Sequence, residues 1–357
     1  MGTPMAKKPT PIPAKVQLGS SPLSAVPIGY PVNPPPITLK TVEKIAFVFP
    51  GQGSQKIGMG KDLIENYPEA EILFNKANEA LKEERVDIGK IWFEGPEEEL
   101  KNTVNAQPAI LTISTILCEL LRKNKIEPSM VAGHSLGEYS ALVASSAIKF
   151  EDAVKLVRKR GEYMQNATPA GTGSMLAIID LEKDEISKMC DKINNIGIVE
   201  IANHNSPTQI VVSGEIKALE KLSVMAKEKG ARMAIPLKVS APFHSSFMET
   251  AKENLARYLE KVKIDNPKIP VNCNVTADYI NNKEEVRSAL IKQMTHPVKW
   301  VDTITKMNSE GINYFIEVGP GKVLKGLIKQ IIPESKVFNV FDSNSLQNVV
   351  EKMGEVL

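Results

Sequence analysis

Short apolar runs alternate with amphipathic stretches along the chain from residue 41 onward. The runs have the length of buried strands, and the amphipathic stretches carry apolar residues at helical spacing. This strand–helix alternation predicts a parallel sheet covered by helices. The elements expected in this part are strands at 44–49 and 129–132 and helices at 69–82, 108–123, 136–148 and 151–165.

The pattern changes in the middle of the chain, where the order becomes strand, helix, strand, strand, helix, strand. This order is that of a ferredoxin-like unit. We therefore expect an α/β fold in which a small ferredoxin-like subdomain at 167–239 is inserted into a large hydrolase-like subdomain made of 41–166 and 240–357. The expected strands of the unit are 174–180, 198–202, 209–213 and 232–239, with helices at 182–194 and 215–229; a helix at 251–261, a strand at 314–318 and a helix at 322–332 follow it.

The first 40 residues differ from the rest, with ten prolines, four lysines and no Asp, Glu or Arg. Such a stretch cannot bury enough apolar surface to fold, so we expect a disordered leader, either a cloning remnant or part of a targeting peptide. It has no secretory apolar core, and it lacks the arginines of a typical transit sequence. The expected location is the cytoplasm, with a plastid or mitochondrion as the alternative.

The overall composition is that of an ordinary globular protein, with 42% hydrophobic and 24% charged residues among 357. A net charge of +2 offers no strong field for nucleic acid or for an acidic partner. The three cysteines are widely separated and form no C-x-x-C pair, so neither a zinc site nor a disulfide framework is expected. The most apolar stretch, 108–121, contains polar residues and is expected to be a core helix with Pro108 in its first turn.

The most specific motif is the pentapeptide Gly-His-Ser-Leu-Gly at 133–137, between an apolar strand and an apolar helix. A G-x-S-x-G sequence at a strand-to-helix junction is the nucleophile elbow. Its glycines permit a tight turn that exposes the Ser135 hydroxyl at the start of a helix, where backbone N–H groups can stabilise an oxyanion. A loop that merely caps a helix is the alternative. The flanking elements favour an acyl-transferring enzyme.

A serine nucleophile needs a base, and histidine is the usual one. The chain has four histidines. His134 adjoins the serine and should point away from its hydroxyl, His204 is expected at a turn, and His296 precedes a proline in a polar loop. His244 lies in a loop just past a strand end, downstream of the nucleophile, and is the best candidate for the base.

A loop with two glycines at 49–55, Phe-Pro-Gly-Gln-Gly-Ser-Gln, follows the first strand. Its spacing fits neither phosphate-binding template, because Lys56 stands where G-x-G-x-x-G needs glycine and Met59 stands where the P-loop needs lysine. Close backbone approach to a reacting carbonyl is the better use of these glycines, and an ordinary tight turn is the alternative.

The helix expected at 151–165 carries three consecutive cations, at 158–160. A solvated helix face is the default interpretation of each. One of them could instead bind a carboxylate, since the guanidinium fork matches two oxygens.

Together these residues resemble the malonyl-CoA:acyl-carrier-protein transacylases of type II fatty acid synthesis and the related acyltransferase domains of polyketide synthases. The resemblance covers residues 44–332 and rests on seven motifs in the family's order. They are Phe-Pro-Gly-Gln-Gly-Ser-Gln at 49–55, Gly-His-Ser-Leu-Gly-Glu-Tyr at 133–139, Lys-Arg-Gly-Glu-Tyr-Met-Gln at 159–165, Asn-Ser-Pro at 205–207, Ala-Pro-Phe-His-Ser at 241–245, Gln-Met-Thr-His-Pro-Val at 293–298 and Glu-Val-Gly-Pro-Gly-Lys-Val-Leu at 317–324. His204 departs from the family, where an aromatic residue is common.

The resemblance implies a role for each matching position. Ser135 would be the nucleophile and His244 the general base and acid, while the backbone N–H groups of Gln52 and Leu136 would form the oxyanion hole. The substrate-binding positions that it implies are Arg160 for the malonyl carboxylate, Gln293 with a carbonyl that orients His244, His134 and Asn205 in the same pocket, and Phe243, which suits malonyl rather than a branched acyl group. The active site would lie between the two subdomains.

The implied activity is transfer of malonyl from malonyl-CoA to the phosphopantetheine thiol of acyl carrier protein through a malonyl-serine intermediate. It implies no metal, no cofactor, no nucleic acid, no membrane and a monomer. Rival interpretations are an α/β-hydrolase such as a thioesterase, a polyketide acyltransferase and a non-catalytic docking module. Hydrolases usually supply an acid between serine and histidine and lack the Gln52 loop with Arg160, and the intact Ser135 and His244 argue against a docking module.

Acyl carrier protein is typically acidic, so the resemblance also implies a basic rim near the active site. A solvated helix face is the alternative for each candidate residue. The candidates are Lys155, Arg158, Lys159, Lys322, Lys325 and Lys329.

Overall fold

The structure is a computed structural model that describes residues 43–84 and 87–356, together with Gly2. The leader expected at 1–40 lies outside the described residues. The strands are β1 (Ile45–Phe49), β2 (Met130–Gly133), β3 (Gly173–Ile179), β4 (Val199–Ser206), β5 (Gln209–Glu215), β6 (Met233–Pro236), β7 (Val271–Asn272), β8 (Tyr279–Ile280), β9 (Tyr314–Val318) and β10 (Lys336–Val340). The α-helices are α1 (Lys61–Asn66), α2 (Pro68–Ala80), α3 (Ile88–Glu94), α4 (Glu97–Lys101), α5 (Thr103–Lys123), α6 (Gly137–Ala144), α7 (Phe150–Gln165), α8 (Lys183–Ile193), α9 (Ile216–Glu228), α10 (Glu249–Leu259), α11 (Lys283–Gln293), α12 (Trp300–Ser309), α13 (Val323–Ile331) and α14 (Ser343–Gly354), and short 3₁₀ helices lie at Lys82–Glu84 and Ser246–Met248.

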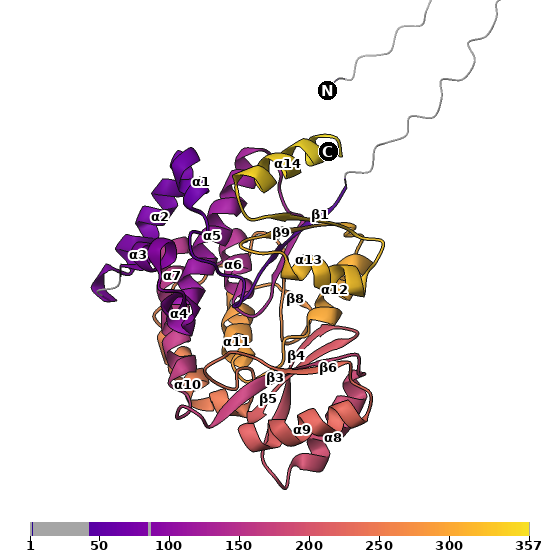
Figure 1. The fold of residues 1–357 in the computed structure, drawn as a ribbon. Coiled ribbons are helices and arrows are strands. Elements are labelled where there is room, and N and C mark those ends of the chain that lie inside the picture. The colour runs from indigo at the N-terminus through magenta and orange to yellow at the C-terminus, as the bar shows by residue number, and fades with distance from the viewer. Residues whose placement is uncertain (1, 3–42, 85–86, 357) are drawn as a thin grey trace, which may run out of the picture. The chain divides into compact units, whose positions relative to one another are not determined.

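Six strands form one sheet in the order β10-β9-β1-β2-β7-β8. Figure 1 labels β1, β8 and β9 of this sheet. All of its neighbouring pairs are parallel except β7 with β8, which is antiparallel. The parallel sheet with covering helices is therefore confirmed. The short β7 and β8 were not predicted, because two-residue strands leave no periodic signal in the sequence. The five-residue β10 was not predicted either.

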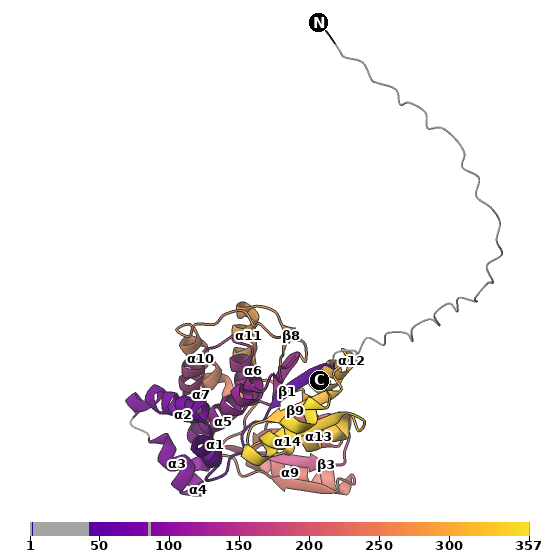
Figure 2. The same cartoon turned by 90° about the horizontal axis from the view of Figure 1, so that it is seen from above.

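The sheet is buried on both faces, as parallel sheets usually are. Along β1, Ile45, Phe47 and Phe49 belong to one core cluster, which includes residues of α5, α6 and α7. The alternate residues Ala46 and Val48 belong to a second cluster, with residues of α12 and α13. Figure 2 shows these two groups of helices on opposite sides of β1 and β9. The two-residue period of a strand thus explains why β1 is apolar throughout.

The middle of the chain forms a separate four-stranded antiparallel sheet in the order β4-β5-β3-β6. With α8 and α9 it has the element order that the sequence predicts for a ferredoxin-like unit. Its apolar residues form a third core cluster between the sheet and these two helices (Figure 1). The limits of the unit at residues 167 and 239 stay a prediction.

Helix α5 begins at Thr103, so the expectation that Pro108 lies in its first turn is wrong. Proline has no N–H, so the carbonyl of Val104, four residues earlier, lacks its helical donor. That carbonyl instead accepts a hydrogen bond from Arg158 Nη1 of α7 at 3.2 Å. This hydrogen bond from α7 satisfies the carbonyl that Pro108 leaves without a donor, which favours a proline inside α5. Among the described residues α5 is also the one helix long and apolar enough to span a membrane, but 89% of its most apolar window is buried inside the protein.

The carboxyl ends of the parallel strands lie at one edge of the large sheet, where open α/β proteins bind ligands. The loop at 50–55 follows β1, the elbow follows β2, and Asn274 follows β7. Helix α6 begins directly after the elbow and ends at Ala144, four residues before the expected end. This edge of the sheet is where the candidate chemistry gathers.

Candidate active site

The elbow turns directly from β2 into α6. Ser135 has a φ of 51°, in the left-handed region that non-glycine residues rarely adopt. A Cβ on Gly133 would lie 1.9 Å from the backbone of Gly137, and a Cβ on Gly137 would lie 2.0 Å from the carbonyl oxygen of Phe49. Both glycines are therefore required by close approach of backbone to backbone, as the G-x-S-x-G spacing predicts.

The Ser135 hydroxyl is hydrogen-bonded to His244, which lies 109 residues further along the chain. The distance from Oγ to Nε2 is 2.8 Å, and Nδ1 of the same ring lies 2.9 Å from the backbone oxygen of Gln293. Because a carbonyl only accepts, Nδ1 carries the proton and Nε2 is free to accept one from the serine. The predicted pairing of Ser135, His244 and the Gln293 carbonyl is thus present in the geometry.

The environment of His244 keeps its ring neutral. The side chain is 4% exposed, and its backbone φ of 57° is again left-handed. Burial, and next the Arg160 cation, lower the pKa of His244 to about 3, although its hydrogen bond to Gln293 opposes this. A ring that is neutral near pH 7 can accept a proton, which a general base must do.

Arg160 projects from α7 into the same site and is 1% exposed. Its Nη1 donates to Gln107 Oε1 at 2.9 Å. Its Nη2 donates to Gln293 Oε1 at 2.8 Å and to Ser135 Oγ at 3.2 Å, and the guanidinium lies 5.2 Å from the centre of the Tyr139 ring.

No carboxylate within the described ranges lies within 4.0 Å of the Arg160 guanidinium nitrogens. Burial lowers the pKa of Arg160, but an arginine side chain remains charged in proteins. The site therefore holds a buried cation surrounded by neutral acceptors. Such a charge favours a ligand that brings a negative group of its own.

The loop after β1 packs against the elbow. A Cβ on Gly51 would lie 2.6 Å from the His134 carbonyl oxygen. The Gln52 side chain is fixed by a hydrogen bond to the start of α5, in which its Nε2 donates to Thr103 Oγ1 at 3.0 Å. Within residues 43–84 and 87–356, the backbone N–H groups of Gln52 and Leu136 have no hydrogen-bond acceptor, so both are free to serve a ligand oxygen.

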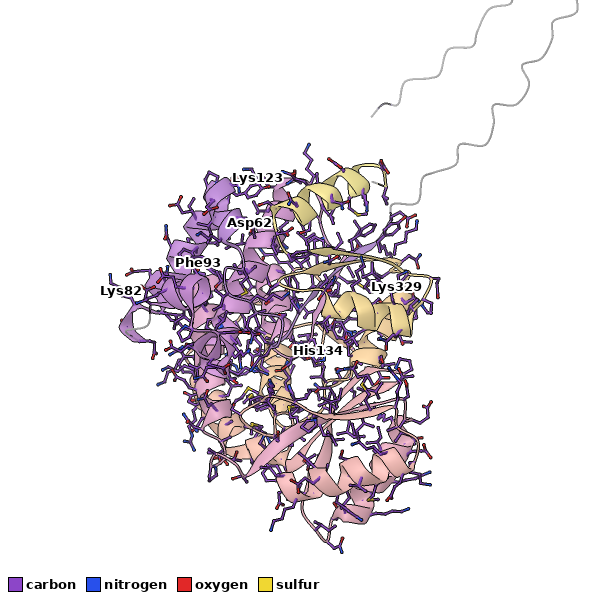
Figure 3. The ribbon with its side chains drawn as sticks, in the orientation of Figure 1. Asp62, Lys82, Phe93, Lys123, His134 and Lys329 are labelled. Carbon is purple, nitrogen blue, oxygen red and sulfur yellow. The ribbon has the colours of Figure 1, made fainter. Side chains whose placement is uncertain are left out.

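His134 points away from Ser135, as expected. Its Nε2 donates to Asn205 Oδ1 of β4 at 2.7 Å, and its ring packs edge-on against Trp300, 5.6 Å between centres. Figure 3 shows His134 in the interior, where the elbow approaches the four-stranded sheet. The expectation that His204 lies at a turn is wrong, because it is within β4 and its N–H donates to the Val298 carbonyl. Pairing with β5 carries β4 beyond its predicted end, and the bond to Val298 adds a contact with the chain before α12.

Phe243, the remaining predicted binding residue, is buried beside His244 in the chain. Its carbonyl oxygen accepts a hydrogen bond from Ser213 of β5, which fixes the loop that carries the histidine. His296 is exposed, as its polar loop predicts.

Two members of the predicted basic rim are not free surface cations. Arg158 is buried, with Nη1 bonded to Asn105 and to the Val104 carbonyl. Lys159 pairs with Glu84 at 2.7 Å and with Glu162 at 3.0 Å. In contrast, Lys155 and Lys322 are exposed. Lys329 is exposed too, but its Nζ donates to the carbonyls of Pro333 and Ser335.

Three polar residues of the site escaped sequence reasoning. Gln107 holds Arg160, and its signal was an amide among the apolar residues of α5. Glu138 is a buried acid in α6, whose other residues carry no charge. Asn274 Oδ1 accepts from the Ser135 N–H at 2.7 Å, but it follows a two-residue strand and leaves no local signal. Among the described residues, no group of three or more His, Cys, Asp and Glu side chains is placed to hold a metal ion.

Comparison with known proteins agrees with this geometry. Residues 46–347 match the family described as acyl transferase domain. The malonyl CoA-acyl carrier protein transacylase of Bacillus subtilis is 46% identical over 315 residues, which are 88% of this chain and 98% of that protein. The enzyme of the same name from Escherichia coli K12 is 43% identical over 290 residues, 81% of this chain and 93% of the relative.

Solved structures give the same result. The malonyl CoA-acyl carrier protein transacylase of Coxiella burnetii has a TM-score of 0.84 and 41% identity, covering 87% of this chain and 98% of that one. A malonyl-transacylase solved in complex with a type II polyketide acyl-carrier protein has a TM-score of 0.83 and 40% identity, covering 87% and 100%. The chain belongs to the acyl transferase domain family and, within it, to the malonyl CoA-acyl carrier protein transacylases.

Proposed function

We propose that this protein transfers malonyl from malonyl-CoA to the phosphopantetheine thiol of acyl carrier protein, with Ser135 as the residue that carries the acyl group. Family membership supports the activity. The observation that carries the residue assignment is the triangle of Ser135, His244 and Arg160, in which Ser135 Oγ lies 2.8 Å from the imidazole and 3.2 Å from the guanidinium.

In the first half-reaction, His244 Nε2 accepts the proton of Ser135 while the serine oxygen attacks the thioester carbonyl carbon. The N–H groups of Gln52 and Leu136 would bind the oxyanion of the tetrahedral intermediate, which is the most effective place for preorganised donors. When the C–S bond breaks, the proton on His244 passes to the departing CoA sulfur. Malonyl is then held as an ester on Ser135.

In the second half-reaction, the carrier protein's thiol takes the place of CoA. His244 accepts the thiol proton, the sulfur attacks the ester carbonyl, and the Ser135 oxygen recovers a proton as it leaves. Throughout, Arg160 would bind the free carboxylate of malonyl with its two-nitrogen fork. Phe243 would limit the space beside the acyl chain, and His134 with Asn205 would line the same pocket.

Each group that this mechanism needs is a side chain or backbone N–H of this chain, so we propose that it requires neither metal nor cofactor. We propose a cytoplasmic monomer, with a plastid or mitochondrion as the alternative location. Supply of a polyketide pathway is the second candidate role, because the relative solved in complex carries a polyketide carrier protein. The subdomain limits at 41–166, 167–239 and 240–357 remain part of this proposal.

Intact-mass spectrometry after mixing with malonyl-CoA tests the proposed function. We expect one malonyl group on the protein, and its loss to holo acyl carrier protein when that protein is added. The rival hydrolase predicts release of malonate as fast without carrier protein as transfer with it. That result, or no covalent acyl group at all, would refute the proposal.

The pH dependence of Ser135 acylation should show the low basicity of His244. Only the neutral imidazole can accept a proton, and a pKa of about 3 keeps it neutral as the pH falls through the ordinary histidine range. We therefore expect acylation by acetyl-CoA, whose acyl group has no carboxyl, to continue below about pH 6.5. In Arg160→Ala the acid limb should move to higher pH, because one cation that opposes protonation is gone. A wild-type acid limb near pH 6.5 would contradict the assignment.

A further inference from the structure

Glu138 is a buried carboxyl to which the mechanism above gives no role. It lies in the first turn of α6, three residues after the nucleophile, and is 0% exposed. Its Oε2 accepts two hydrogen bonds, from Gln293 Nε2 at 2.7 Å and from the Asn274 N–H at 3.2 Å. Its Oε1 has no partner among the described residues. A single oxygen therefore holds two residues that come from different elements, α11 and the loop after β7.

The first of these residues, Gln293, connects the base to the cation. Its backbone oxygen accepts from His244 Nδ1 at 2.9 Å, and its Oε1 accepts from Arg160 Nη2 at 2.8 Å. The side-chain Nε2 that Glu138 holds also lies 3.0 Å from the Ser135 carbonyl oxygen. If this amide turned, Arg160 would lose one of its neutral acceptors, and the residue whose backbone oxygen orients His244 would lose its side-chain anchor.

The second residue, Asn274, supports the strained elbow. Its Oδ1 accepts from the Ser135 N–H at 2.7 Å, and its Nδ2 donates to the Gly133 carbonyl at 2.6 Å. These two bonds span the turn in which Ser135 has its left-handed φ. A conformation of this kind costs about 1–3 kcal/mol and persists only where its surroundings over-determine it.

We propose that Glu138 is a positioning residue for acyl transfer. It holds Gln293 and Asn274, and through them it keeps Arg160, His244 and Ser135 in one fixed arrangement. The proposal rests on the function proposed above.

The hydrogen bonds of Glu138, rather than its negative charge, are what the arrangement uses. Both donors that it binds are neutral amides, and no cation pairs with it within 4.0 Å in the described part of the chain. Burial raises the pKa of Glu138 to about 7, so a large fraction of the carboxyl is neutral at the pH of the cell. A side chain of the same length with one acceptor oxygen in the place of Oε2 would hold the same two partners.

Two conservative substitutions of Glu138 separate the effect of its side-chain length from the effect of its negative charge. Glu138→Gln keeps the length and one acceptor oxygen but has no charge. Glu138→Asp keeps the acid but is shorter by one methylene, so its oxygens cannot reach both amides from the same backbone position. Glu185→Gln, on the exposed face of α8, is the control for losing one carboxylate.

The readouts are kcat, KM and the ratio of kcat/KM for malonyl-CoA to that for acetyl-CoA, each expressed per protein molecule that becomes acylated. We expect Glu138→Gln to stay within about threefold of wild type. We expect Glu138→Asp to lose on the order of 10²-fold in kcat, the typical cost of misplacing reacting groups by about 1 Å, and to lower the malonyl-to-acetyl ratio.

A merely structural role would reduce the fraction of molecules that become acylated and leave that ratio unchanged, which would overturn the proposal. Wild-type behaviour of Glu138→Asp, or an equal loss in both variants, would also overturn it. Failure of the proposed function is a separate result, since it would be seen as no acylation of the wild-type protein.

Discussion

Ser135→Ala should form no covalent malonyl-enzyme and should lose about 10⁴-fold or more of transfer activity. The substitution removes the oxygen that lies 2.8 Å from His244 Nε2 and leaves the base without a partner. Alanine also has a Cβ, so the left-handed backbone at this position is no more strained than before. The fold should therefore be retained, and the loss is expected in the chemical step. Intact mass after exposure to malonyl-CoA, together with steady-state transfer to holo acyl carrier protein, measures both effects.

A matched control is Ser246→Ala, which removes an exposed hydroxyl two residues after His244. This variant should be acylated like the wild type. Acylation of Ser135→Ala to the wild-type extent would place the nucleophile elsewhere and would remove the basis of the mechanism.

Arg160→Ala should reverse the preference between malonyl-CoA and acetyl-CoA. In the wild type the malonyl carboxylate would pair with a buried cation that has only neutral acceptors around it. Truncating one partner of a buried charged pair costs about 2–5 kcal/mol, so kcat/KM for malonyl-CoA should fall by roughly 30-fold or more. Acetyl has no carboxylate to pair with the cation, and its transfer should be unchanged or faster.

Two further variants define the origin of this effect. Lys155→Ala removes an exposed cation from the same helix and should leave the ratio between the two substrates unchanged. Arg160→Lys keeps the charge but lacks the two-nitrogen fork, so it should recover part of the malonyl preference. A malonyl-to-acetyl ratio in Arg160→Ala equal to that of the wild type would show that the carboxylate is bound elsewhere.

The parts of the site that the sequence predicts are those with a local signal. The elbow is recognisable because its two glycines stand at a fixed spacing around the serine and the apolar flanks are visible beside them. His244 could be chosen because the chain offers only four histidines, and the other three adjoin the serine or were expected at a turn or in a polar loop. The same choice by residue type cannot identify the amide side chains of the site, because Asn and Gln are too common in the chain.

The parts that the sequence does not predict depend on contacts between distant segments. Pro108 reads as a helix start, yet α5 continues through it because a side chain from α7 takes the carbonyl that the proline leaves free. The expected turn at His204 is strand, since the pairing of β4 with β5 continues through it, and the segment before α12 bonds to the same stretch. Glu138 lies within the motif at 133–139 and Asn274 in none, and only the folded chain brings these two residues together, 136 positions apart.

The proline in α5 has a consequence for how selective the transferase can be. Because Pro108 has no N–H, the Val104 carbonyl is left to accept from Arg158, two positions before the guanidinium proposed to recognise the substrate, and this bond ties α7 to α5 at that point. The placement of the proposed carboxylate-binding group thus depends in part on a donor that is missing from another helix.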